Sequence, residues 1–311
     1  MTNAAVRQHL LSGAVSGFAG AVFLQPLDLL KTRIQQGDSA ISSNSRNTAL
    51  IWRTTHDIIK QDGMKGLWRG TAATLVRNVP GVALYFTSLT HLRSIMANSP
   101  SFSVQEVTTK DGVKTVLPKL TSQGNLLAGA AARVGVGFLL NPFSILKARF
   151  ESELHAYKSL SSSLLSMARM GPSELMRGFV ASSLRDAPYS GLFVVIYESV
   201  KRESSKSIVP HLKRSSIAPS AYATTIHGFS AASAGAIATM ATHPFDVIKT
   251  KMQVRSEERY RGFASTVSRT WQQRGVAGFF DGGSLRMSRK ILSSVIGWAI
   301  FEGMLLFLQK Q

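Results

Sequence analysis

The sequence contains no cysteine and few acidic residues. Without cysteine, disulfides and thiolate metal sites are excluded. Only 17 Asp and Glu stand against 36 Lys and Arg among 311 residues, which gives a net charge of +19. A cleavable signal is also missing, because Met1 to Leu11 is short, polar and weakly basic. We therefore expect any organelle address to be internal.

Arrangements that carry enzyme chemistry are missing as well. The sequence shows no nucleophile–base arrangement, no glycine-rich phosphate loop and no cluster of metal ligands. These absences disfavour an enzyme, and we expect neither a cofactor nor a metal. A strongly basic chain can be a nucleic-acid-binding protein, but here the bases are not gathered in a tail or stripe. They alternate with apolar segments, and 44% of the residues are hydrophobic, which favours a membrane protein with basic loops or a basic interior.

Long uncharged segments support the membrane interpretation. The segments Leu10 to Leu27 and Ser215 to Phe245 are long enough to cross a bilayer as helices. Hydropathy alone supports these two spans. The other apolar segments are interrupted by charges, which are costly facing lipid and are expected to face a water-filled centre.

A nine-residue motif occurs three times in the chain. In each copy a proline is followed by Asp or Ser two residues later and by bases at plus five and plus seven; the copies are Gln25 to Arg33 (QPLDLLKTR), Asn141 to Arg149 (NPFSILKAR) and His243 to Lys251 (HPFDVIKTK). The prolines Pro26, Pro142 and Pro244 lie 116 and 102 residues apart. A proline removes a backbone donor and kinks a helix. We therefore predict one body built from three units of about a hundred residues, outside the short solenoid periods.

Each unit has the same predicted layout. A small-residue helix ends in the proline motif, and an amphipathic helix, a glycine-containing turn and a second apolar helix follow. The amphipathic helices are predicted at Ala49 to Gln61, Leu160 to Met170 and Phe263 to Gln273. The expected fold is an all-α membrane protein with six transmembrane helices in a single domain over residues 1–311. Its three tandem repeats are predicted at about 6–98, 120–203 and 220–309.

The triple motif resembles the mitochondrial carrier family over essentially the whole chain. The turns Asp62 to Gly70, Gly171 to Gly178 and Gly275 to Gly282 add to the resemblance, although Met176 and Asp281 depart from its aromatic–base–Gly ending. The resemblance implies a threefold pseudosymmetric cavity with short matrix helices. It also implies a multi-pass location in the mitochondrial inner membrane, a monomer, and a lipid environment that includes cardiolipin.

The resemblance also assigns the motif residues to a gate on the matrix side. Asp28 is expected to pair with Lys147, and Asp246 with Lys31. Ser144 replaces the acid of the second copy, so Lys249 is expected to have only a hydrogen-bond partner there. Gln35 and Gln253 stand where family members place a glutamine that braces such a pair, and Glu151 holds this position in repeat two. The alternative is a set of surface ion pairs, each of little energetic value.

A second gate is expected on the cytoplasmic side. Glu198 and Lys201 follow Tyr197 in the family's aromatic–acid–x–x–base pattern. Repeat one keeps only the base, Arg93, and repeat three only the acid, Glu302. The one complete ionic link would be Glu302 with Arg93. Helix-end interfacial charges are an alternative explanation.

A substrate level is predicted from the repeat. Seven residues after Gly70, Gly178 and Gly282, each unit has an arginine followed by a polar residue: Arg77-Asn78, Arg185-Asp186 and Arg289-Lys290. By resemblance this is the family's substrate contact level. An arginine beside an aspartate offers a bidentate partner for a carboxylate and an anion for an ammonium. The alternative is that Arg185 and Asp186 only neutralise one another or cap the helix. Arg133, nine residues before Pro142, is a second candidate that either lines the cavity or relieves crowding.

These residues favour a carrier of a small amino acid. Within the family, a base–acid pair at this level resembles amino-acid transporters. Glycine suits a site with one carboxylate partner, one ammonium partner and no evident side-chain pocket. Other candidates are carriers of ornithine-like cations or S-adenosylmethionine, which would require an added acid or an aromatic pocket. A membrane protein that binds or uncouples without carrying a solute also stays open. A nucleic-acid-binding protein would explain the charge but neither the uncharged segments nor the repeat.

Overall fold

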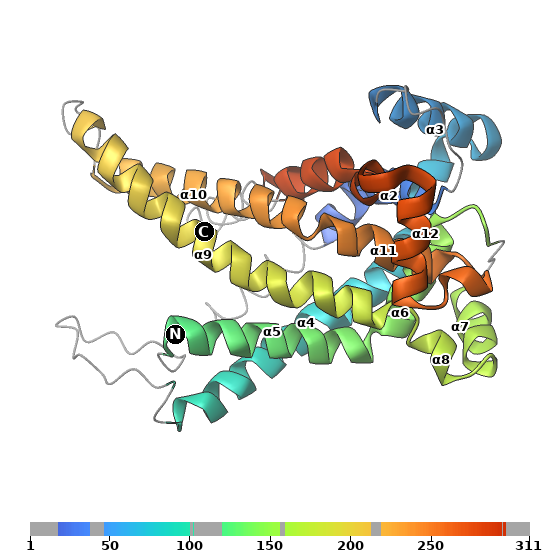
Figure 1. The fold of residues 1–311 in the computed structure, drawn as a ribbon, viewed down its shortest axis with the longest axis horizontal. Coiled ribbons are helices and arrows are strands. Elements are labelled where there is room, and N and C mark those ends of the chain that lie inside the picture. The colour runs from blue at the N-terminus through green and yellow to red at the C-terminus, as the bar shows by residue number, and fades with distance from the viewer. Residues whose placement is uncertain are drawn as a thin grey trace, which may run out of the picture. The chain divides into compact units, whose positions relative to one another are not determined.

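The chain is all-α in the residues that the structure describes (Figure 1). The structure is a computed structural model that describes residues 18–37, 47–99, 102, 120–155, 159–212, 219–293 and 295–296. Within these ranges the regular structure is helical, apart from one isolated bridge residue at Leu120. Two sets of segments form separate compact units: residues 1–80, 140–181 and 243–311, and residues 81–139 and 182–242. We call them the motif unit and the long-helix unit.

Each proline motif begins a new helix after a short interruption. The helix over residues 18–23 is followed by α2 (Gln25–Gln36), α5 (Ser122–Leu139) by α6 (Asn141–Glu151), and α10 (Pro219–Ala241) by α11 (His243–Val254). The interrupting residues are Leu24, Leu140 and Thr242. Proline has no N–H for the preceding turn, but its fixed φ suits the first turn of a helix. The three motif prolines therefore each lie in the first turn of a helix.

The three amphipathic helices were predicted correctly. They are α3 (Asn47–Asp62), α7 (Leu160–Arg169) and α12 (Phe263–Arg274). Each is followed by a short helical turn: η1 (Met64–Trp68), α8 (Pro172–Leu175) and η3 (Gly275–Phe280). Each also packs its apolar face against its own motif helix, with Leu29 meeting Ile58 in repeat one, Ile145 meeting Met167 in repeat two and Met252 meeting Phe263 and Val267 in repeat three. The motif unit thus has one apolar cluster per repeat.

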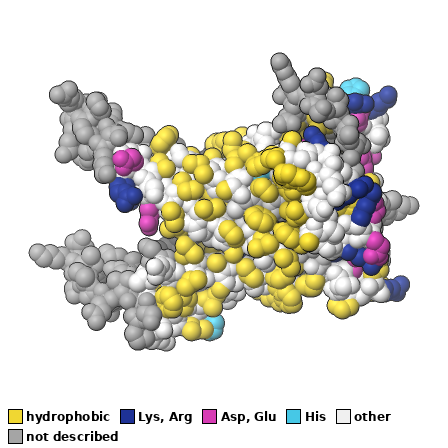
Figure 2. Space-filling view, in the orientation of Figure 1, with side chains coloured by type: hydrophobic (Ala, Val, Ile, Leu, Met, Phe, Trp, Pro, Cys, Tyr) yellow, Lys and Arg dark blue, Asp and Glu magenta, His cyan; other side chains and the backbone are white. Residues whose placement is uncertain are grey.

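Long helices follow the turns. They are α4 (Thr71–Ala97), α9 (Phe179–Leu212) and the helix over residues 283–293. In the long-helix unit, Leu89 of α4 packs against Ala128 and Ala132 of α5, where small side chains let the helices approach closely. Many apolar side chains of the long helices are exposed, as the yellow surface in Figure 2 illustrates, with Val79 68% and Phe86 and Val195 each 60% exposed.

The described residues contain no single helix that is long and apolar enough to cross a membrane. Across the break at Leu140, α5 and α6 together meet the criterion of length and composition.

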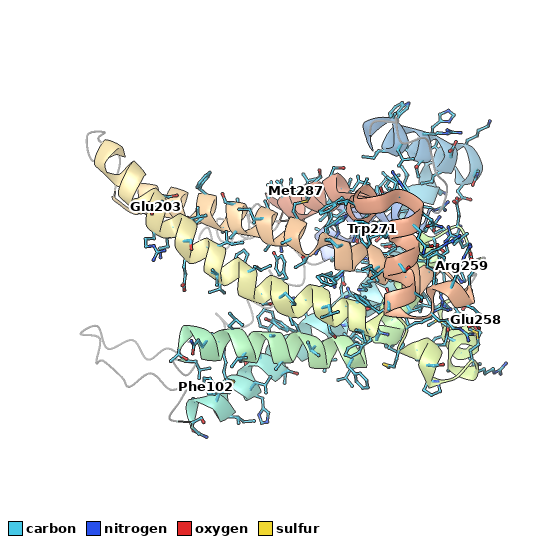
Figure 3. The ribbon with its side chains drawn as sticks, in the orientation of Figure 1. Phe102, Glu203, Glu258, Arg259, Trp271 and Met287 are labelled. Atoms are coloured by element: carbon cyan, nitrogen blue, oxygen red, sulfur yellow. The ribbon has the colours of Figure 1, made fainter. Side chains whose placement is uncertain are left out.

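A charged segment follows α11. It contains η2 (Glu258–Tyr260), whose Glu258 and Arg259 are labelled in Figure 3. The Tyr260 ring is fully buried, and the cationic groups of Arg255 and Arg259 lie 5.7 and 5.5 Å from its centre. These cation–π contacts fix the segment against the end of α11.

Candidate functional site

Two acid–base pairs link motif helices of different repeats. The Lys147 Nζ lies 2.6 Å from the Asp28 carboxylate, and the Lys31 Nζ lies 2.5 Å from the Asp246 carboxylate. Both aspartates are buried, at 7% and 1% exposure. Removing one partner of such a buried pair typically costs about 3–5 kcal/mol, because the other charge is left uncompensated. The structure therefore brings together the residues of both predicted pairs, and their role as a gate is considered below.

The serine that replaces the acid in the second motif copy has a different contact. The buried Ser144 hydroxyl accepts a hydrogen bond of 2.7 Å from Arg77 Nε and donates one to the Leu140 carbonyl. Lys249 also lies buried, on α11. An arginine from a long helix thus binds the position at which the other two repeats have an aspartate.

The predicted bracing residues lie beside the pairs. The Thr250 hydroxyl donates to Gln35 at 2.7 Å, and the Thr32 hydroxyl donates to Glu151 at 2.8 Å. The Glu151 carboxylate also lies 3.5 Å from Lys147 Nζ. In repeat two, Lys147 therefore has a second carboxylate beside it, in addition to that of Asp28.

The third bracing position has fewer contacts. Its threonine is replaced by Ala148, and the buried side-chain nitrogen of Gln253 has no hydrogen-bond partner among the described residues. Two of the three interfaces between repeats are therefore braced by a threonine, and the third is not.

The residue before each motif proline is a site that sequence reasoning missed. Gln25 donates to the Arg69 carbonyl at 3.0 Å, and Asn141 donates to the Arg177 carbonyl at 3.3 Å. His243 Nε2 lies 3.0 Å from the Asp281 carbonyl. All three motif copies have a polar residue directly before the proline, and this recurrence is the sequence signal that indicates the site. Each one ties the start of its motif helix to the turn of its own repeat.

The turn glycines leave room for the bracing residues. Gly70, Gly178 and Gly282 have φ angles of +89°, +71° and +72°, which favour glycine. A Cβ on Gly178 would lie 2.9 Å from the Gln253 side chain, and one on Gly70 would lie 3.0 Å from that of Glu151. Glycine therefore permits the turn of one repeat to approach the motif helix of the next.

The departure of Asp281 from the family pattern has a structural explanation. In repeat one, Arg69 lies 3.9 Å from Asp62, seven residues earlier. In repeat three, Asp281 lies 2.8 Å from Arg274, also seven residues earlier. The ion pair is therefore kept at the same two places with its signs exchanged.

The three predicted substrate arginines have different partners. In the motif unit, Arg77 bonds to Ser144 and Asn78, and Arg289 contacts Asp28. In the long-helix unit, Arg185 makes a bidentate contact with its neighbour Asp186, with distances of 2.8 and 2.9 Å. The two side chains are 17% and 30% exposed. Arg185 and Asp186 thus neutralise one another in this structure, while Lys290 is exposed.

The other predicted charges that the structure describes lie in the long-helix unit. The Arg133 guanidinium lies 4.8 Å from the centre of the Tyr85 ring, so α5 and α4 share a cation–π contact. Lys201 lies 5.9 Å from the Tyr197 ring, and Glu198 is exposed. The side-chain Nε of Arg93 is buried and has no hydrogen-bond partner among the described residues. Glu302 lies outside the described residues, so the predicted pair with Arg93 stays a prediction.

Comparisons with known proteins assign the class. A family model described as mitochondrial carrier protein matches residues 3–100, 118–207 and 220–311. The chain belongs to this family, which makes it a transporter rather than an enzyme. It is 60% identical to a mitochondrial glycine transporter of Laccaria bicolor over 98% of both chains. It is 40% identical to a protein of the same name from Mycosarcoma maydis, over 94% of this chain and 82% of the relative. A third, from Coccidioides immitis, is 37% identical over 97% of this chain and 90% of the relative.

Proposed function

We propose that this protein imports glycine across the mitochondrial inner membrane for the synthesis of 5-aminolevulinate and haem. The observation that carries the proposal is the 60% identity, over almost the full length, to a relative named for glycine transport. The protein is a multi-pass monomer in a bilayer that contains cardiolipin. Transport proceeds by alternating access, with the substrate held between two gates.

The pair of Arg185 and Asp186 is the proposed contact for the cargo. Glycine is a zwitterion, so its carboxylate can take the place of Asp186 on the guanidinium. Its ammonium can at the same time take the place of Arg185 on the carboxylate. The exchange conserves charge and replaces bidentate contacts of 2.8 and 2.9 Å with contacts of the same kind. It requires no pocket for a side chain.

The acid–base pairs between repeats are the proposed matrix gate. The pairs Asp28–Lys147 and Asp246–Lys31 hold helices of different repeats together, so the gate opens only when both separate. Arg77 and Arg289 contact Ser144 and Asp28, two residues of the same ring.

Uptake by reconstituted protein tests the proposed cargo. Liposomes containing the purified chain are supplied with a panel of labelled amino acids, nucleotides and carboxylates, and initial rates are compared with those of protein-free liposomes. We expect saturable uptake of glycine and little uptake of ornithine or S-adenosylmethionine. If another member of the panel is taken up faster than glycine, that compound is the cargo instead of glycine. No uptake of any member would favour a membrane protein that carries no solute.

A further inference from the structure

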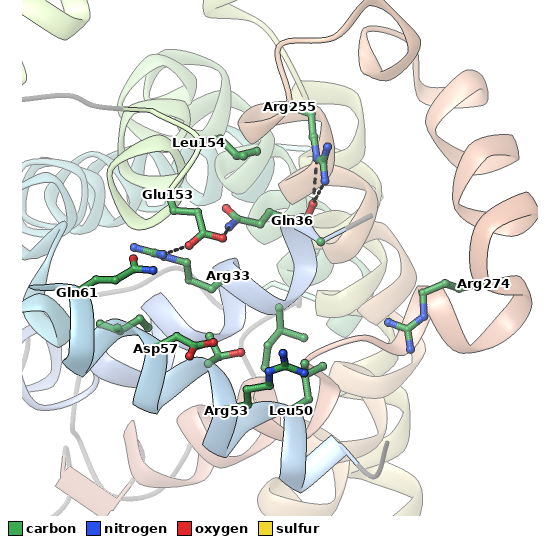
Figure 4. A pocket seen from close by; sticks show the side chains of 14 residues that line it. Arg33, Gln36, Leu50, Arg53, Asp57, Gln61, Glu153, Leu154, Arg255 and Arg274 are labelled. Carbon is green, nitrogen blue, oxygen red and sulfur yellow. Dashed lines mark hydrogen bonds and ion pairs between the residues drawn. The ribbon is translucent and has the colours of Figure 1, made fainter. Parts of the chain in front are cut away.

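The ends of the motif helices are joined by arginines that bond to backbone carbonyls of a different repeat. In the motif unit, one arginine Nε of each repeat donates to a carbonyl in the last turn of the motif helix of the next repeat: Arg33 to Glu151 at 3.1 Å, Arg149 to Gln253 at 3.0 Å, and Arg255 to Gln36 at 2.9 Å. A second nitrogen of Arg255 donates to the same Gln36 carbonyl at 2.7 Å, as Figure 4 shows. The contacts run from repeat one to two, from two to three and from three to one. We call these three arginines the capping ring.

The position of the acceptors makes these contacts favourable. The last carbonyls of a helix have no partner within the helix, and they carry the negative end of its dipole. A guanidinium that donates to one of them is therefore attracted by charge as well as by the hydrogen bond. Arg33 and Arg149 are 7% and 1% exposed, so little water competes for their contacts. Each arginine thus caps a helix of another repeat.

Arg255 takes the place of the second motif base in repeat three. That base is Arg33 in repeat one and Arg149 in repeat two, but Lys251 in repeat three. The Lys251 Nζ lies 6.0 Å from the centre of the Tyr260 ring, and a lysine has no planar fork with which to hold a carbonyl through two nitrogens. Arg255 follows four residues later, and its amide bonds to the Lys251 carbonyl at 2.9 Å, so it continues the turn of α11. An arginine one turn further along therefore closes the ring, at a place outside the nine-residue motif.

The capping ring is complete at the interface where the motif contacts are weakest. Between repeats two and three, Ser144 stands in place of a motif aspartate and Ala148 in place of a bracing threonine. At this interface Arg149 and Arg177 both donate to backbone carbonyls of repeat three. A backbone acceptor is present whatever the side chain, so this contact does not depend on the missing acid.

We propose that Arg255 is a further residue of the matrix gate. With Arg33 and Arg149 it holds the ends of the motif helices together in the closed state, and it releases the Gln36 carbonyl when the gate opens. Gln36 lies eight residues after Asp28, about 12 Å further along α2. The gate therefore has two layers, acid–base pairs in one and capped helix ends in the other. The role in opening rests on the proposed carrier function, whereas the contact between repeats does not.

Amide hydrogen exchange of the purified full chain tests the contact without transport. Arg255→Gln should speed exchange over residues 33–37 by about tenfold, because the last carbonyl of α2 loses a charged donor. Exchange in α7 should not change, which shows that the chain stays folded. The matched control is Arg259→Gln, since Arg259 shares with Arg255 the contacts with Glu257 and the Tyr260 ring. Equal acceleration at the end of α2 in both variants, or none in Arg255→Gln, would overturn the contact as a link between repeats.

Glycine uptake by a Ser144→Asp chain tests the role in the gate. A carboxylate at this place would meet Arg77 and slow the opening of the gate. Adding Arg255→Gln should then raise kcat by about five- to tenfold with little change in KM, because one contact of the closed state is lost. A loss of stability alone would not raise kcat. Arg255→Lys, which keeps the charge and a donor, should raise it less, and Arg259→Gln should not raise it.

Two results would overturn the role of Arg255 in the gate. One is a kcat that stays as low with Arg255→Gln as in Ser144→Asp alone, and the other is an equal recovery with Arg259→Gln. A chain that carries no glycine, yet shows faster exchange at the end of α2 in Arg255→Gln, would support the contact and overturn the proposed function.

Discussion

Replacing Ser144 with aspartate should slow transport by adding an ion pair to the gate. The hydroxyl of Ser144 accepts a hydrogen bond of 2.7 Å from Arg77 Nε, so a carboxylate at this place would meet a guanidinium directly. Ser144 is 8% exposed, which limits screening of the new pair by water. Arg77 belongs to repeat one, so the new ion pair would add to the link between repeats one and two that Asp28 and Lys147 make.

The magnitude follows from the position of the new pair. Exposed ion pairs contribute about 0.2–1 kcal/mol, and close pairs at interfaces about 1.5 kcal/mol or more. A pair at this partly buried place is expected to add about 1–1.5 kcal/mol to the closed state. Since about 1.4 kcal/mol corresponds to a factor of ten, opening should slow by about five- to tenfold.

The assay is the initial rate of glycine uptake into liposomes as a function of glycine concentration. We expect Ser144→Asp to lower kcat by about five- to tenfold with little change in KM or in the order of preferred substrates, because the pair acts on the gate. Ser144→Asn is the matched control, similar in size but without the charge. An unchanged rate in Ser144→Asp, or an equal loss in Ser144→Asn, would refute the electrostatic argument.

Three further predictions concern the turns and the loop after α6. Either Asp62→Arg or Arg69→Asp alone should lower the thermal stability, and the two changes together should restore it, because repeat three has the exchanged pair at these places. A double variant that is no more stable than the single variants would contradict this. Gly178→Ala should lower the free energy of unfolding by more than about 1 kcal/mol, and by more than Gly171→Ala does. Both glycines have a positive φ, but only at Gly178 would the added Cβ also meet a close neighbour. Equal losses in the two variants would show that the close approach has no cost. Burial, together with the nearby Arg149 and Arg177, lowers the pKa of His155 to about 4. The unfolded chain therefore binds the proton more readily, and stability should fall as the pH falls from about 6.5 to 4; His155→Asn should flatten this dependence, and an unchanged pH profile would argue against it.

The contacts between motif helices could be predicted because the repeat allows acid–base links between consecutive units. The family resemblance then implies which acid pairs with which base. The structure contains both expected pairs, Asp28 with Lys147 and Asp246 with Lys31. The amphipathic helices were equally accessible, because their periodicity is local and their ends coincide with turn glycines.

Contacts that depend on side-chain direction could not be predicted in this way. Counting from the turn glycine placed Arg77 and Arg289 at one depth, but it did not reveal that they contact Ser144 and Asp28. Long flexible side chains reach across several possible partners, and the sequence does not rank them. Position 281 by itself looks like a loss of the motif, because the partner that restores the ion pair, Arg274, lies seven residues earlier in the sequence.

Uptake of labelled glycine by liposomes containing Arg185→Ala or Asp186→Ala tests the central claim most directly. The unmodified chain should show saturable uptake, and each variant should lose it while its thermal unfolding stays cooperative. The loss should be complete in both, because one side chain binds the carboxylate and the other the ammonium of the cargo. Near-normal glycine uptake by both variants would contradict the account.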